Sequence, residues 1–158
     1  MKIVYLLRHA KSRTGLPGQS DHDRPLSRRG RESCLLLAEH FARSAIRPEQ
    51  VVCSTSVRTR ETLQRLYAAL GQEFPTRFDR ALYLAEAEEL LRLLRRVGTN
   101  PASVLLVGHN PGLELLALQL AGNHEDATYR QLRAKFPTGT LATIVFALDD
   151  WRKIGPDL

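Results

Sequence analysis

The chain has 158 residues, of which 43% are hydrophobic and 25% are charged, and its formal net charge at pH 7 is +6. Such a chain fits a single soluble globular domain over residues 1–158, and its two cysteines exclude a disulfide-rich scaffold. The positive charge admits nucleic acid, acidic proteins and phosphorylated substrates as partners, but the arginines are scattered, so charge alone selects none of these classes.

The first apolar run covers residues 3–7 and ends at Arg8. It is too short for the core of a signal peptide or for a membrane span, so we expect a cytoplasmic protein without a membrane partner. Cys34 falls within an apolar helical pattern and Cys53 ends an apolar strand-like run. We therefore expect two buried free thiols in a reducing compartment.

Apolar runs predict five strands along the chain. They cover residues 3–7, 51–53, 76–78, 104–107 and 141–148. Four of these runs are rich in valine, isoleucine and leucine without polar alternation, which is typical of strands covered on both faces.

Apolar residues at helical spacing predict four helices between the strands. The first follows Ser27, the second runs from Ser56 to Gly71, the third from Ala87 to Gly98, and the fourth from Pro111 to Gly122. Strands that alternate with helices in this way indicate an α/β fold with a mainly parallel sheet and helices on both of its faces.

Charged side chains follow three of the predicted strands. Arg8 and His9 come directly after the first strand, Arg58 comes shortly after the second, and His109 follows the fourth. Because ligands of parallel sheets bind beyond the carboxyl ends of the strands, we expect these four side chains to lie together. Each of them alone could be structural, but their shared edge of the sheet favours a functional site.

This set of side chains suits the transfer of a phosphoryl group. The guanidinium groups of Arg8 and Arg58 can bind phosphoryl oxygens, and the first turn of a helix at Arg58 adds free backbone N–H groups. A neutral imidazole at His9 can attack phosphorus and form a phosphohistidine, and a protonated His109 can stabilise the transferring group. The residues therefore predict a covalent mechanism.

Other polar residues near these segments have weaker signals. Lys11, Ser12 and Asn110 are further candidates for substrate contacts because they adjoin the two histidines. The remaining histidines lie in polar loops or on the outer face of a helix, so we expect them at the surface. They are His22, His40 and His124.

Four ordered motifs resemble the histidine phosphatase superfamily. They are Arg8-His9-Ala10-Lys11-Ser12, Asp23-Arg24-Pro25-Leu26-Ser27-Arg28-Arg29-Gly30, Ser54-x-x-x-Arg58-x-x-x-Thr62 and Gly108-His109-Asn110-Pro111-Gly112-Leu113. They span most of the chain, from Met1 to Leu148, and look like the small SixA-type phosphohistidine phosphatases. The resemblance implies a three-layer α/β/α sandwich of the phosphoglycerate mutase-like kind. It also implies phosphorylation of His9 in a pocket formed with Arg8, Arg58 and His109.

Two departures from the family pattern bear on the substrate. The more usual Arg-His-Gly is here Arg8-His9-Ala10. The larger sugar-phosphate mutases and phosphatases carry a carboxylate proton donor after the third strand, and this chain has no clear equivalent. Glu86 is more consistent with a helix start, and Asp23, the other candidate general acid, equally suits a turn.

A missing general acid favours a phosphorus–nitrogen bond in the substrate. An alkoxide leaves phosphorus poorly unless an acid protonates it, whereas an imidazole can leave already protonated. The short segments between the motifs also leave little chain for a lid, so we expect an open mouth that admits a phosphorylated side chain of a protein.

We therefore expect a monomeric phosphatase that needs no metal or other cofactor and that acts on a phosphohistidine-bearing protein. Two alternatives stay open. The same pocket can serve a small phosphorylated molecule such as a phosphate monoester or a nucleotide, or the chain can be a phosphoprotein-binding module without turnover.

Other chemistries fit the sequence less well. Four residues separate Cys53 from Arg58, whereas a cysteine-phosphatase loop needs five. No cysteine or histidine pairs have metal-ligand spacing, and no phosphate-binding glycine loop is present. A nucleic-acid partner is not expected, because the basic residues of two predicted helices lack interleaved aromatics, although they can guide an acidic protein. They are Arg92, Arg95, Arg96, Arg130 and Arg133.

Overall fold

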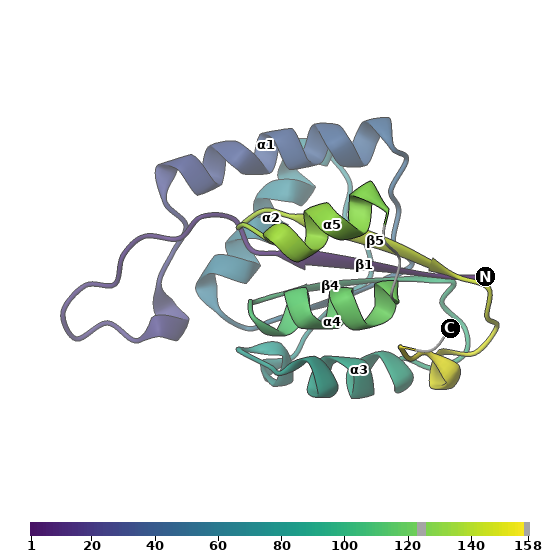
Figure 1. Cartoon of the computed structure of the whole chain (residues 1–158). Helices are drawn as coiled ribbons and strands as arrows, with labels where there is room; N and C mark the ends of the chain where they lie inside the picture. The colour runs from purple at the N-terminus through teal and green to yellow at the C-terminus, as the bar shows by residue number, and fades with distance from the viewer. Residues whose placement is uncertain (123–125, 157–158) are drawn as a thin grey trace.

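A five-stranded sheet forms the middle layer of the computed structural model, which describes residues 1–122 and 126–156 (Figure 1). Its strands are β1 (Lys2–Arg8), β2 (Gln50–Cys53), β3 (Thr76–Phe78), β4 (Ser103–Gly108) and β5 (Leu141–Phe146), in the order β3-β2-β4-β1-β5. The first four strands run parallel, and β5 pairs antiparallel with β1 at one edge. All five expected strands are present, and the sheet is mainly parallel as predicted.

Burial along the strands follows their place in the sheet. Every residue of the central strand β4 is buried, as the uninterrupted apolar run predicted. The edge strand β5 instead exposes Thr143 and Val145 between more protected residues, and it ends at Phe146 rather than at Leu148. An antiparallel edge strand with one covered face alternates in this way.

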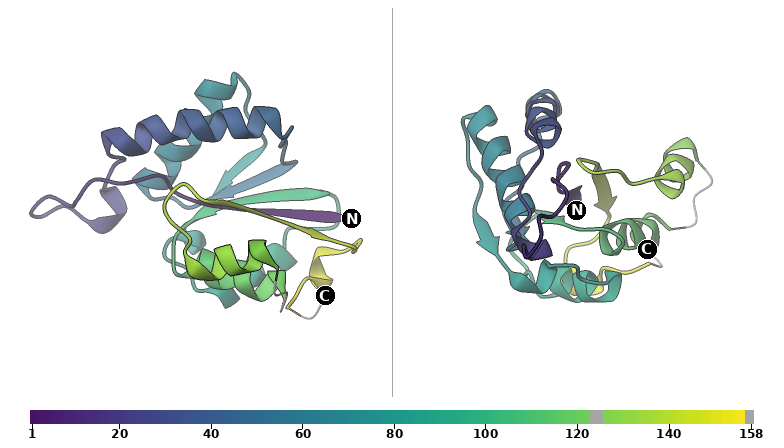
Figure 2. Two further views of the ribbon diagram at one scale, coloured as in Figure 1. Left: turned by 45° about the horizontal axis from the view of Figure 1, so that its top comes forward. Right: turned by 90° about the vertical axis from the view of Figure 1, so that its left-hand side faces the viewer.

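Helices cover both faces of the sheet, so the α/β fold has three layers (Figure 2). On one face, α1 (Arg28–Arg43) and α2 (Val57–Leu70) pack Phe41 and Leu66 against apolar residues of the sheet such as Leu7. On the other face, α3 (Ala87–Arg95) and α4 (Gly112–Ala121) form a second core cluster that includes Leu94 and Leu116. The short α5 (Ala127–Ala134) lies beside α4 and β5 (Figure 1).

Two of the expected helices begin with side-chain caps in the structure. The hydroxyl of Ser27 accepts from the backbone N–H of Gly30, and the hydroxyl of Ser56 accepts from that of Thr59. Such caps satisfy backbone donors that the first turn leaves free. The fourth helix begins at Gly112, one residue after the expected position at Pro111.

Two glycines let loops approach helix starts closely at the carboxyl edge of the parallel strands. A Cβ atom on Gly30 would lie 2.0 Å from the carbonyl oxygen of Lys11, and one on Gly112 would lie 1.9 Å from that of Ala85. Any larger side chain would push the loop away. These contacts fix the loop after β1 against α1 and the loop before α3 against α4.

The two cysteines are free and buried, as expected. Burial raises the pKa of the Cys34 thiol to about 11 and that of the Cys53 thiol to about 12, so neither is a reactive thiolate near pH 7. Among the helices of the described residues, none combines the length and the apolar character that crossing a membrane requires.

Candidate active site

Pairing between β1 and β4 brings the two key histidines together. Arg8 is opposite Gly108 in the parallel register, and the backbone N–H of His9 donates to the Gly108 carbonyl at 3.1 Å. His9 and His109 therefore leave neighbouring strands at the same level, and their ring centroids lie 5.3 Å apart. Both rings are buried, with exposed fractions of 7% and 3%.

Arg58 bridges the two rings from the first turn of α2. Its Nε donates to Nε2 of His9 at 3.3 Å, and its Nη2 lies 3.4 Å from Nδ1 of His109. The side chain is almost wholly buried. The structure thus places His9, His109 and Arg58 in one cluster at the carboxyl edge of the sheet, as the positions after the strands predicted.

Hydrogen bonds select one neutral tautomer of His9. Its Nδ1 lies 2.7 Å from the Ala10 carbonyl oxygen, which can only accept, so Nδ1 carries the proton. Nε2 then keeps its lone pair and accepts from Arg58. Burial, followed by the positive charges of Arg58 and Arg8, lowers the pKa of His9 to about 4. At pH 7 the imidazole is therefore neutral, which a nucleophile requires.

His109 is also neutral in the free protein. Its Nδ1 faces the Arg58 guanidinium, which can only donate, so Nε2 carries the proton and donates to the Ser54 hydroxyl at 2.8 Å. Burial, followed by the neighbouring His9 and Arg58, lowers the pKa of His109 to about 3. The protonated His109 expected from the sequence is thus not the state of the free site. A bound anion would raise this pKa.

Arg8 is held from the opposite side by the chain after α5. Its Nη1 donates to the Phe136 carbonyl at 2.8 Å, and Asn110 donates from Nδ2 to the same oxygen at 3.0 Å. Asn110 also bonds Glu114 at 2.9 Å. Within the described residues, Nε of Arg8 and Oδ1 of Asn110 are buried without a hydrogen-bond partner. Asn110 therefore lies beside Arg8, where the sequence suggested a contact residue.

Lys11 and Ser12 lie on the loop after β1. Lys11 is exposed, and its backbone carbonyl accepts from Ser27. The Ser12 hydroxyl accepts from Arg24 at 3.0 Å. Neither side chain has a hydrogen bond to the two histidines or to Arg58 among the described residues.

The two candidate general acids are also outside the cluster. Glu86 is exposed at the start of α3, where its backbone N–H bonds the Glu89 carboxylate, so its interpretation as a helix start is confirmed. Asp23 is exposed in a short 3-10 helix, Asp21–Asp23, and its carboxylate lies 3.5 Å from the ring of His22. In the part of the chain that the structure describes, no three His, Cys, Asp or Glu side chains are grouped to hold a metal ion.

Sequence reasoning missed three residues at this site. Asp21, between β1 and α1, forms an ion pair with Arg58 at 3.0 Å. Tyr83 donates to the Asp21 carboxylate at 2.6 Å, and its ring packs edge-on against His109 with centroids 5.3 Å apart. Ser54 bonds His109 and was noted only as part of a motif. Asp21 sits two residues before the noted Asp23, in a loop with no periodic signal.

His22, expected at the surface, is only partly exposed, at 24% of its side chain. Its Nε2 lies 2.9 Å from the Thr55 hydroxyl, and its ring packs edge-on against Tyr83 with centroids 4.8 Å apart. His22 is thus the last in a row of packed rings that begins at His9 and continues through His109 and Tyr83. His40 is exposed on α1, as expected. His124 lies outside the described residues.

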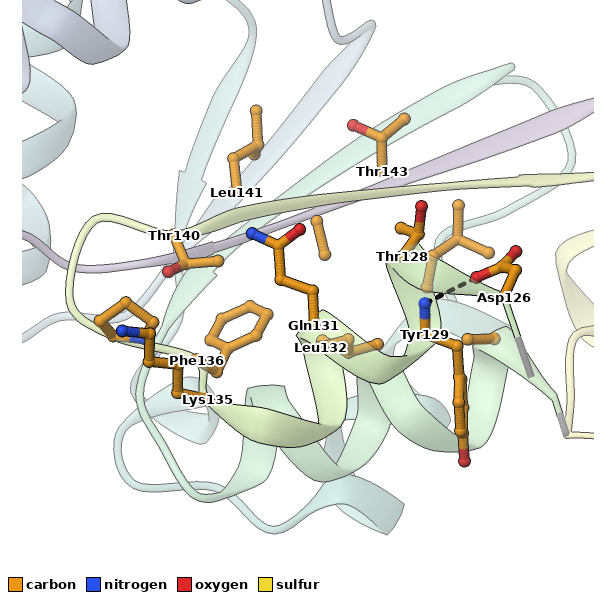
Figure 3. A pocket seen from close by; sticks show the side chains of 14 residues that line it. Asp126, Thr128, Tyr129, Gln131, Leu132, Lys135, Phe136, Thr140, Leu141 and Thr143 are labelled. Atoms are coloured by element: carbon orange, nitrogen blue, oxygen red, sulfur yellow. Dashed lines mark hydrogen bonds between the residues drawn. The ribbon is translucent and has the colours of Figure 1, made fainter. Parts of the chain in front are cut away.

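A hollow of about 380 Å³ lies beside the site, between α5 and β5 (Figure 3). Leu132, Phe136 and Ile144 give it apolar walls, and Gln131 and Thr140 add polar groups. The two histidines and Arg58 do not line it. Phe136 joins it to the site, since its side chain faces the hollow and its carbonyl holds Arg8.

Comparison with known proteins assigns the chain to a family. The sequence pattern of the histidine phosphatase superfamily (branch 1) matches residues 4–83. An uncharacterized protein of Mycobacterium tuberculosis is 35% identical over 153 residues, which cover 95% of this chain and 92% of the relative. An uncharacterized chloroplastic protein of Arabidopsis thaliana is 32% identical over 128 residues, or 75% of this chain and 59% of the relative.

Comparison with solved structures finds the same fold in related proteins. A protein from Agrobacterium tumefaciens, described as a candidate phosphohistidine phosphatase SixA, superposes with a TM-score of 0.81 at 34% identity and covers 90% of both chains. The protein histidine phosphatase SixA complexed with tungstate superposes with a TM-score of 0.77 at 23% identity, over 97% of this chain and 92% of that one, which shows the shared fold. The chain belongs to the histidine phosphatase superfamily, branch 1, and has the phosphoglycerate mutase-like fold of SixA structures.

Proposed function

We propose that this phosphatase transfers a phosphoryl group from its substrate to Nε2 of His9 and then from His9 to water. The observation that carries the proposal is the neutral His9 with its proton on Nδ1, because its unprotonated Nε2 keeps a lone pair for phosphorus and accepts a hydrogen bond from Arg58 in the free protein. In the first step the Nε2–phosphorus bond forms and the bond to the leaving group breaks. In the second step water attacks phosphorus, and His9 leaves with its lone pair restored.

Three cationic or potentially cationic groups stabilise the phosphoryl oxygens in this proposal. Arg58 is buried between the rings, and Arg8 has a buried Nε donor that is free to bond a phosphoryl oxygen. Fixed donors of this kind stabilise negative charge in transfer because they need little reorganisation. His109 takes up a proton as the anion enters, because the anion offsets the neighbouring positive charges that lower its pKa.

Phosphohistidine on a cytoplasmic protein is the substrate that we propose. Asp23 and Glu86, the carboxylates suggested by the sequence, are exposed, and within the described residues neither bonds His9, His109 or Arg58. The Asp21 carboxylate is closer, but the hydroxyl of Tyr83, with Arg24 and Arg58, holds its pKa well below the usual range. It therefore stays ionised and cannot protonate an alkoxide. A phosphorus–nitrogen bond needs less acid assistance, since imidazole leaves as a neutral or protonated ring.

Phosphate release from two labelled proteins tests this substrate. The same carrier protein would be phosphorylated on histidine in one sample and on serine in the other, and each would be mixed with the enzyme. We expect release from phosphohistidine only, and no release by His9→Ala. Release from phosphoserine alone would overturn the substrate class. Phosphohistidine protein that binds the wild type without any release would leave a binding module as the function.

A further inference from the structure

Asp21 bonds three side chains around the site and was not noted in the sequence. Its Oδ2 accepts from Tyr83 at 2.6 Å and from Arg58 Nη2 at 3.0 Å, and its Oδ1 accepts from Arg24 Nε at 2.9 Å. Its backbone carbonyl accepts from Arg58 Nη1 at 2.7 Å. The segment that carries it projects past the carboxyl ends of the strands (Figure 1), so Asp21 ties this projection to α2.

The hydrogen bonds of Arg58 divide into two sets. Nη1 and Nη2 donate outward to Asp21, whereas Nε and Nη2 face inward toward nitrogen atoms of His9 and His109. A guanidinium has five N–H donors in a rigid plane. Four of the five are therefore engaged in the free protein, two with Asp21 and two with histidine nitrogens.

The inward set cannot survive the proposed reaction. Nε2 of His9 uses its lone pair to bond phosphorus, so it no longer accepts from Arg58. Nδ1 of His109 ceases to accept once the ring is protonated. Two donors of Arg58 then need new acceptors, and phosphoryl oxygens can supply them. The outward set involves no reacting atom and can remain in place.

We propose that Asp21 is a positioning residue that holds the outer donors of Arg58, so that the inner donors pass from the two histidines to the phosphoryl group without movement of the guanidinium. This inference rests on the proposed phosphoryl transfer.

Burial and charge support the division of roles. Only 3% of the Arg58 side chain is exposed, so its charge needs a counter-ion, and the Asp21 carboxylate supplies one while 47% of its own side chain stays exposed. Tyr83 also donates a hydrogen bond to this carboxylate. Tyr83 lies on the loop before α3, where the Ala85 carbonyl packs closely against Gly112. The carboxylate is thus held by groups other than Arg58 and need not leave when an anion enters.

The variants Asp21→Asn and Asp21→Ala test the inference, each made in the wild type and in an Arg58→Ala background. Asp150→Asn is the matched control, because Asp150 also bonds an arginine, Arg152, at a short 3-10 helix, Trp151–Lys153. The measurements are kcat/KM on a phosphohistidine protein, the inhibition constant of orthovanadate, and thermal unfolding.

We expect Asp21→Asn to lower kcat/KM and to weaken vanadate inhibition, each by about tenfold or more, which is the scale of a charged hydrogen bond. In the Arg58→Ala background the same change should alter both by less than about twofold, because Asp21 acts through Arg58. Asp150→Asn should match the wild type.

Four results would overturn the inference. Tighter vanadate inhibition in Asp21→Asn would mean that the carboxylate competes with the phosphoryl group. Equal losses with and without Arg58, accompanied by a lower unfolding temperature, would mean a structural role. An active wild type that Asp21→Asn leaves unchanged would remove the role of Asp21 alone, whereas a wild type without turnover would remove the proposed function and this inference with it.

Discussion

Arg58 donates from Nε to Nε2 of His9 at 3.3 Å, so the proposed anion clamp bonds the proposed nucleophile before any substrate arrives. The contact places the lone pair of Nε2 beside the donors that would receive phosphoryl oxygens. Burial of the ring lowers the pKa of His9, and the positive charge of Arg58 lowers it further. The contact therefore fixes the position of the ring and adds to the effect of burial on its protonation state.

The ring of His9 should remain neutral well below pH 6.5. Burial, Arg58 and Arg8 lower its pKa to about 4, and the Ala10 carbonyl keeps the proton on Nδ1. Histidine ring nitrogen NMR of the free protein should show an unprotonated Nε2 throughout the range from about pH 7 to pH 5. A midpoint near 6.5, or a proton on Nε2, would contradict this state.

Arg58→Ala should raise the pKa of His9 and impair the anion site together. The change removes a charge that lowers the His9 pKa and a buried donor pair. We expect the NMR midpoint of His9 to move up toward 6.5 and kcat/KM to fall by about a hundredfold or more. Arg60→Ala, an exposed arginine on the same helix, is the control. A lower His9 pKa in Arg58→Ala would be incompatible with the geometry.

The stability of the protein should fall on acidification partly because of His109. Its pKa is about 3 in the folded protein and near the ordinary 6.5 in the unfolded chain, so the unfolded chain binds more protons between these values. Stability therefore rises with pH across this window and is lost as pH falls below about 6.5. Urea unfolding at about pH 7 and pH 4.5 should show a smaller loss for His109→Gln than for the wild type. Equal losses would mean that His109 does not titrate as described.

Gly112→Ala should destabilise the fold by displacing the loop that carries Tyr83. The new Cβ would lie 1.9 Å from the Ala85 carbonyl oxygen, and such overpacking costs about 1–3 kcal/mol or more. The matched variant is Gly108→Ala, whose Cβ would have the Leu113 side chain as its nearest contact, at an ordinary 3.6 Å. Denaturant unfolding should separate the two variants. A Gly112→Ala protein as stable as the wild type would show that the loop yields freely.

The sequence predicted the sheet and the convergence of the site because both depend on regular patterns. Apolar runs located all five strands, and the rule that ligands bind at carboxyl ends predicted that His9, Arg58 and His109 lie together. These inferences need only the order of the elements and the residues at strand ends.

The contacts made by the loops were not predictable in this way. Asp21 reaches Arg58 across 37 positions of sequence, and Tyr83 reaches Asp21 across 62. No period or motif marks such pairs, because the path of an irregular loop is set by tertiary packing. The contacts of His22 were missed for the same reason, since its partners Thr55 and Tyr83 belong to other loops.

The protonation state of His109 was also not predictable from the sequence. The sequence suggested a protonated His109 because a charged ring can stabilise the transferring group. Only the burial of the ring and the proximity of Arg58 show that the free imidazole is neutral. The protonation state of a buried group depends on its distances from neighbouring charges, and these distances cannot be derived from the order of the residues.

The most direct test of the covalent mechanism is to stop the reaction during turnover of a radiolabelled phosphohistidine protein and to locate the label on the enzyme. The mechanism predicts an acid-labile, base-stable phosphate on Nε2 of His9 that is absent in His9→Ala and present in His40→Ala. Label on a different residue would contradict the mechanism. A His9→Ala variant that turns over as fast as the wild type would also contradict it.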